Sequence, residues 1–154
     1  MTLTRKATGA RPAAKTVGRP TDWRKRFAAN KGPKVVVIKS DFAGIKAGSR
    51  LFVATPGVIA NYVQRIPAGQ TRSIERLRNA LARKHGAAAT CPVTTAIFLR
   101  VVAEAAWDDL MAGAAPSAVV PFWRVIEPGS PIARRLRCDS RWIEVQRAVE
   151  AQGG

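Results

Sequence analysis

The sequence has few acidic residues, and this shortage is its most informative feature. Only 10 Asp and Glu stand against 26 Lys and Arg, which gives a net charge of +16. A surplus of one sign repels itself unless a polyanion neutralises it. The charge balance therefore indicates a nucleic acid as the leading partner and an anionic membrane surface as the second.

Cysteine and histidine are also scarce. The chain has two cysteines, Cys91 and Cys138, and one histidine, His85. Without a cysteine-spacing framework we expect reduced thiols in an intracellular protein. The paired ligand spacing of a zinc site is missing as well, so we expect no metal and no other cofactor. No complete set of catalytic side chains is visible, which favours a binding protein over an enzyme.

Long apolar runs are absent too. No segment of the sequence approaches the roughly 20 apolar residues that a membrane-spanning helix needs. We therefore expect no membrane span and a cytoplasmic protein, nucleoid-associated if the source is bacterial. The basic, acid-poor N-terminus also has the composition of an organellar transit peptide, but it lacks the amphipathic period of one.

The chain is long enough for one domain and a tail. Its 154 residues, 47% of them hydrophobic, can bury a real core, and we expect a monomer. Residues 1–33 are basic and offer too little apolar surface to offset the entropy of ordering, which predicts a flexible tail that adds nonspecific phosphate contacts. Trp23 and Phe27 predict a short helical turn docked on the domain, or alternatively on a partner. The domain is expected over 34–152.

Within this domain the sequence pattern predicts a mostly helical α+β fold. Short β-branched runs predict strands, and apolar residues at helical spacing predict amphipathic helices. The expected strands are 35–38, 51–54 and 118–126, and the expected helices are 58–66, 73–85, 94–113 and 141–152, with turns at 86–92 and 127–131. Ser73 is expected to cap the second of these helices, and Thr94 or Thr95 the third.

The order of these elements is typical of a winged helix-turn-helix domain. Cations on the outer face of the helix over 73–85 are expected to lie along phosphates, and the next helix is expected to enter a groove with its N-terminal turn. Further arginines follow the turn at 127–131, where a wing would reach the backbone. The expected DNA-binding residues are Arg72, Arg76, Arg83, Lys84, Thr94, Thr95, Arg134, Arg135 and Arg137.

Two short motifs carry a resemblance to a known family. Ile66-Pro67-Ala68-Gly69 is similar to a Val-Pro-x-Gly motif, and Pro121-Phe122-Trp123-Arg124-Val125-Ile126 is similar to a Pro-Cys-His-Arg-Val-Ile motif. Both belong to the C-terminal DNA-binding domain of the O6-alkylguanine-DNA alkyltransferase (methylated-DNA-protein cysteine methyltransferase) family. The resemblance covers 66–152 and is closest to the alkyltransferase-like branch, which lacks the acceptor cysteine. It implies a winged-helix domain that binds DNA in repair.

The departures from the family pattern remove its chemistry. The acceptor cysteine falls on Phe122 and its histidine on Trp123, and neither side chain can accept an alkyl group or relay a proton. The family's phosphate-contacting tyrosine falls on Ile74, and Ala96 occupies the place of the intercalating arginine. Two interpretations of Phe122, Trp123 and the retained Arg124 stay open. They are ordinary core residues, or they line a pocket that stacks on a flipped base.

The sequence therefore predicts a non-enzymatic, alkyltransferase-like protein that binds double-stranded DNA, with recognition of alkylated bases as an extension. One alternative is an alkyl or thiol transferase that uses Cys91 or Cys138. Another is a basic module associated with RNA or the ribosome, because the charge of +16 permits RNA equally well.

Overall fold

A computed structural model describes residues 19–29 and 31–153 as a mixed α/β fold. Over these residues no helix is both long and apolar enough to cross a membrane. The α-helices are α2 (Trp23–Ala28), α3 (Pro56–Gln64), α4 (Ile74–Lys84), α5 (Pro92–Met111) and α6 (Ser140–Gly153), and the strands are β1 (Lys34–Val37), β2 (Arg50–Val53) and β3 (Ala89–Thr90).

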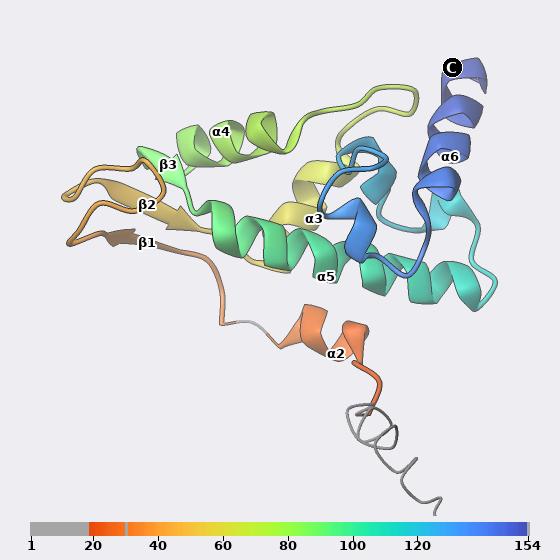
Figure 1. Cartoon of the computed structure of the whole chain (residues 1–154), viewed down its shortest axis with the longest axis horizontal. Coiled ribbons are helices and arrows are strands. Elements are labelled where there is room, and N and C mark those ends of the chain that lie inside the picture. The colour runs from red at the N-terminus through yellow and green to blue at the C-terminus, as the bar shows by residue number, and fades with distance from the viewer. Residues whose placement is uncertain (1–18, 30, 154) are drawn as a thin grey trace, which may run out of the picture.

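Helix α5 is the element on which the others pack. It crosses the middle of the molecule in Figure 1, with α4 on one side, α2 on the other, the sheet at its N-terminal end and α6 towards its C-terminal end. The main core contains four apolar residues of this helix, Leu99, Val102, Ala103 and Ala106. The small alanines let neighbouring helices approach closely, which explains why α2 and α3 both contact this helix.

The sheet has the order β1-β2-β3. Strands β1 and β2 are antiparallel with Val35 opposite Phe52, and β3 is parallel to β2 with Leu51 opposite Ala89. The two strands predicted near 35–38 and 51–54 are confirmed. Strand β3 lies in a segment predicted as a turn, and two residues are too short to give a periodic signal.

The helices predicted at 58–66, 73–85, 94–113 and 141–152 are confirmed, with shifted ends. Ser73 caps α4 as expected, because its Oγ accepts a hydrogen bond of 3.0 Å from the backbone N–H of Arg76. The expected cap of α5 at Thr94 or Thr95 is wrong. This helix begins at Pro92, and proline is well suited to the first helical position because it has no N–H to leave unpaired.

The strand expected over 118–126 is not formed. Instead 3-10 turns occupy η2 (Pro116–Ala118) and η3 (Phe122–Arg124). Backbone hydrogen bonds form between residues near in sequence. Phe122 N–H donates to Val120 O at 2.8 Å, and Ile126 N–H donates to Phe122 O at 2.9 Å. No strand of the described residues lies beside this segment, so its β-branched residues have no ladder to join.

The segment expected to form a wing contains only the 3-10 turn η4 (Ala133–Arg135). In the described residues, no strand follows β3. The three-stranded sheet is therefore built from residues that precede α5. Together with the helices it makes the described part of the chain a mixed α/β fold.

Part of the expected flexible tail is an ordered helix. Residues 1–18 lie outside the described residues, but 23–28 form α2, which contacts α5. Trp23 is only 7% exposed, and Phe27 packs against the core, so the predicted docking of these two aromatics on the domain is confirmed. Arg24 adds an ion pair with Asp109 of α5. The average composition of 1–33 predicted too little apolar surface for an ordered structure. The buried side chain of Trp23 provides enough of it to dock this short helix.

Candidate nucleic-acid interface

The two motifs of the alkyltransferase resemblance meet in space at Arg124. Its Nη1 donates to Ile66 O at 2.7 Å, while Nε and Nη2 form a two-point contact with the carboxylate of Glu150 on α6 at 3.0 and 2.6 Å. The hydrogen bonds from Arg124 hold the pKa of Glu150 below its usual range, against the opposing effect of burial. The guanidinium of Arg124 is thus committed to linking both motifs with the C-terminal helix, and it is not offered to a ligand.

Phe122 and Trp123 are core residues in this structure. Both side chains are 0% exposed. Their ring centroids lie 5.4 Å apart in an edge-to-face arrangement, and Trp142 of α6 stacks on Phe122 at 5.8 Å. A base cannot stack on a ring that has no exposed face. This burial supports the core interpretation and leaves Phe122, Trp123 and Arg124 outside any open base pocket.

The threonines expected to reach a DNA groove do not both face solvent. Thr95 is 0% exposed, and its hydroxyl donates to Cys91 O at 2.7 Å. Thr94 is half-buried. The exposed side chains of this first part of α5 are instead Val93 and Ile97, one turn apart on the same face of the helix. Thr95 is therefore a structural residue.

Arg137 is also committed to internal contacts. It donates to Glu104 at 2.8 Å and to Asp108 at 2.8 Å, and its backbone N–H donates to Glu104 as well. Burial acts to lower the pKa of Arg137, but the hydrogen bonds to these two carboxylates outweigh it, so the pKa is raised. The positive charge of Arg137 is compensated by the buried carboxylate of Glu104, so little of it is left for phosphate.

The remaining expected cations stay exposed or half-exposed. Arg76 and Arg83 lie two helical turns apart on one side of α4, and Lys84 follows at its end. The N-terminal end of α4 shares a hollow of about 330 Å³ with Ser130, lined in part by Arg72. Glu127 also lines this hollow.

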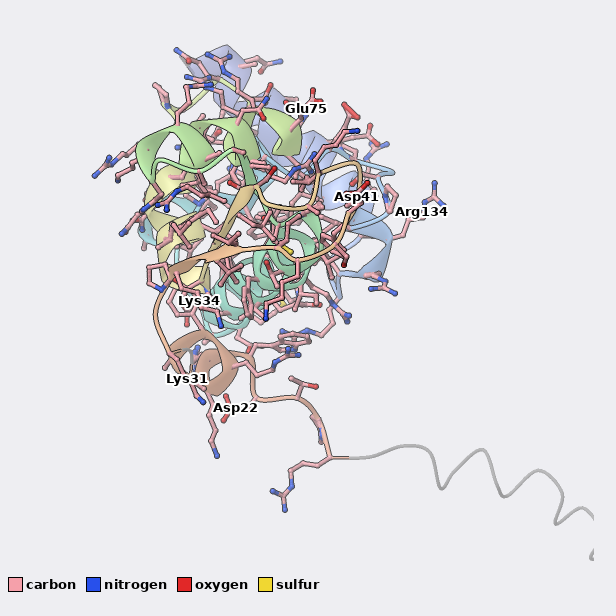
Figure 2. The ribbon with its side chains drawn as sticks, turned by 90° about the vertical axis from the view of Figure 1, so that its left-hand side faces the viewer. Asp22, Lys31, Lys34, Asp41, Glu75 and Arg134 are labelled. Carbon is pink, nitrogen blue, oxygen red and sulfur yellow. The ribbon has the colours of Figure 1, made fainter. Side chains whose placement is uncertain are left out.

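Arg134 and Arg135 lie on η4, after the turn. Arg134 Nε donates to Gly129 O at 3.0 Å, and Figure 2 shows its side chain extending away from the body of the molecule. Arg72 thus lies by a hollow that it shares with Ser130, while Arg83 and Lys84 lie at the far end of α4 beside His85.

Most cations of the described residues have no carboxylate partner. Ion pairs of the described residues use only four arginines, namely Arg24, Arg100, Arg124 and Arg137. No other lysine or arginine in 19–29 and 31–153 has a carboxylate within 4.0 Å. Where these unpaired cations are exposed, their charge is free to meet a polyanion.

Two arginines that the sequence analysis did not select line a groove with Arg135. They are Arg26 of α2 and Arg100 of α5, and Trp23 forms part of the same groove. A signal for Arg26 was present, because it follows Trp23 by three residues and so shares one side of a short helix. Arg100 gave no such signal, since the docking of α2 beside it is a tertiary contact.

The cysteines are poorly placed for chemistry. Both are buried free thiols. Burial raises the pKa of Cys138 to about 11, and the negative charges of Glu104 and Asp139 add to this effect. In the described part of the chain, no group of three or more His, Cys, Asp or Glu side chains is arranged to hold a metal ion.

No family model, curated protein or solved structure matches this chain at a significant level. The resemblance to the alkyltransferases therefore rests on the two motifs and the order of the elements around them.

Proposed function

We propose that this protein binds double-stranded DNA without catalysis, on an alkyltransferase-like scaffold in which α4 and α5 act as the helix pair. The observation that carries the proposal is the large uncompensated positive charge, to which α4 and η4 both contribute exposed arginines. Phosphate contacts fix a protein on the duplex and supply most of its nonspecific affinity. The residues proposed to make them are Arg72, Arg76, Arg83, Lys84, Arg134 and Arg135.

The arrangement of the motifs supports the alkyltransferase-like part of the proposal. Arg124, which the family motif retains, bonds to the backbone of Ile66 in the other motif. The positions of the family's acceptor cysteine and histidine hold aromatic residues that build the core. This pattern fits a protein that retains the fold of the family but has lost the residues for alkyl transfer. Recognition of an alkylated base then requires a surface other than the buried ring of Phe122.

Salt dependence tests the proposal directly. The affinity for a short DNA duplex is measured by fluorescence anisotropy over a series of salt concentrations. Each phosphate neutralised contributes a slope of about −0.9 in log K against log salt, so several contacts predict a slope of several units. Affinity that does not change with salt would contradict phosphate binding.

Two further arms of the same experiment separate the related hypotheses. Structured RNA competes against the duplex at fixed salt, and RNA that binds more tightly than DNA would move the proposal to an RNA partner. A duplex that carries O6-alkylguanine is compared with its unmodified counterpart. Equal affinities would remove recognition of alkylated bases and leave general DNA binding in place.

A further inference from the structure

A groove of about 540 Å³ lies between α2, the first half of α5 and the η4 segment. Three guanidinium groups from three different elements line it, namely Arg26, Arg100 and Arg135, together with Trp23. Ile97 and Ile132 add apolar surface. In Figure 1, α2 lies alongside α5, so the N-terminal segment forms one wall of this groove.

Trp23 fixes the direction of two of these arginines. The guanidinium carbon of Arg26 lies 5.4 Å from the ring centroid of Trp23, and that of Arg100 lies 5.1 Å from it. A guanidinium that lies over an aromatic ring uses its flat face for the contact and keeps the N–H donors at its edge for other partners. Trp23 therefore contacts the guanidinium groups of Arg26 and Arg100 without occupying their hydrogen-bond donors.

The groove has more positive charge than the carboxylates around it compensate. Among the described residues, neither Arg26 nor Arg135 forms an ion pair. Arg100 has one carboxylate neighbour, Glu104, at 3.8 Å, and that carboxylate already accepts from Arg137 at 2.8 Å. The Nε of Arg100 is buried and has no hydrogen-bond partner.

We propose that this groove binds one backbone phosphate of the nucleic acid, and that α2 is a working part of the interface. Arginine forks suit phosphate oxygens because several N–H groups can donate to one phosphate. The apolar side chains of Ile97 and Ile132 suit the adjacent sugar. This inference rests on the proposed function and extends it to Arg26 and Arg100, which neither the family motifs nor the charge pattern selected.

A charge-matched pair of variants tests the inference. Arg26→Gln/Arg100→Gln removes the two cations of the groove that the proposed function does not already use, and Lys25→Gln/Lys39→Gln removes two exposed cations that do not line it. Duplex affinity is measured against salt for both variants and for the wild-type chain. The groove variant is expected to lower the slope by about 0.9, the contribution of one phosphate, whereas the control variant keeps the wild-type slope. Circular dichroism confirms that both variants stay folded.

The outcomes separate this inference from the proposed function. Wild-type binding with equal slopes for the two variants would overturn the groove and leave DNA binding intact. A wild-type chain that does not bind duplex would overturn both. Inorganic phosphate, titrated while the arginine Nε–Hε signals are followed by NMR, distinguishes the source of the anion. Perturbation by phosphate in a chain that ignores nucleic acid would identify a free phosphate compound as the ligand and overturn the backbone assignment.

Discussion

Arg124 shows how a residue can be retained in a motif for reasons of architecture. It stands in the segment that resembles the alkyltransferase motif, yet its donors go to Ile66 O and to Glu150. Side chains of Arg124 and Glu150 are 15% and 13% exposed, so the pair is largely withdrawn from water. We therefore expect the Arg124–Glu150 pair to contribute to the stability of the folded protein.

Glu150→Gln is expected to lower the free energy of unfolding at pH 7 by about 2 kcal/mol, because Arg124 loses a charged partner. The pKa of Glu150 is lowered in the folded protein, mainly by the hydrogen bonds from Arg124. The stabilisation is therefore present above the unfolded-state pKa of a glutamate and is lost as the pH falls through the folded-state pKa.

Urea unfolding of the wild type and Glu150→Gln from pH 7 into the acid range measures this difference. The two curves should converge as the pH falls. Glu144→Gln is the control, because Glu144 lies exposed on the same helix and forms no ion pair among the described residues. A loss of stability as large in the control as in Glu150→Gln would contradict the role given to the pair.

The two thiols are expected to be unreactive in the folded state. Thiolate is the reactive form, and a pKa of about 11 leaves almost none of it on Cys138 at neutral pH. Cys91 is buried at the start of α5. Reaction with a disulfide reagent should be slow in buffer and fast in urea. Rapid labelling of the native protein, or alkyl mass on either cysteine after incubation with alkylated DNA, would reopen the transferase alternative.

At the scale of elements, α2 is the α-helix whose formation depends most on tertiary contacts. Six residues are far too few for a stable helix in water, so this one exists because it is docked. Trp23 is the buried residue of this helix and Phe27 packs beside it against the core, whereas the exposed Arg24 to Asp109 pair contributes at most about 1 kcal/mol. The formation of α2 therefore depends on the docking of its aromatic side chains, above all Trp23.

Trp23→Ala is expected to release α2 while leaving the rest of the fold in place. Loss of a buried tryptophan costs about 3 kcal/mol or more, which exceeds what a six-residue helix can supply. Hydrogen exchange should show lost protection over 23–28 and unchanged protection in α5. Lys25→Gln, on the exposed side of α2, should retain protection. Preserved exchange in Trp23→Ala would mean that other contacts hold the helix.

At the scale of the whole molecule, the position of the charge matters as much as its amount. Arg76→Gln/Arg83→Gln removes two cations from the exposed side of α4, and Lys39→Gln/Lys46→Gln removes two from the segment that connects β1 and β2 at one end of the molecule in Figure 1. Both variants have the same net charge. If α4 lies along phosphates, the first should reduce the salt slope by up to about 1.8 and the second by much less. Equal slopes would indicate that only net charge matters.

The sequence predicted local structure well where a segment carries its own pattern. The hydrophobic spacing of 73–85 and the cap at Ser73 gave α4, and the β-branched run at 35–38 gave β1. The prediction failed over 118–126. Val119, Val120, Val125 and Ile126 favour a strand there, but no strand of the described residues pairs with them. Strand formation depends on a partner, which local composition does not reveal.

The sequence by itself determined the charge of the molecule and most of its helices, because charge is additive and helical hydrogen bonds close within a few residues. Only the tertiary structure decided which cations are available. It pairs Arg124 with the partly buried Glu150 and Arg137 with the buried Glu104. It also encloses Phe122 and Trp123 in the core and brings both Arg26 and Arg100 to the ring of Trp23. The availability of a charged group depends on what packs around it, and residues far apart in the chain make those contacts.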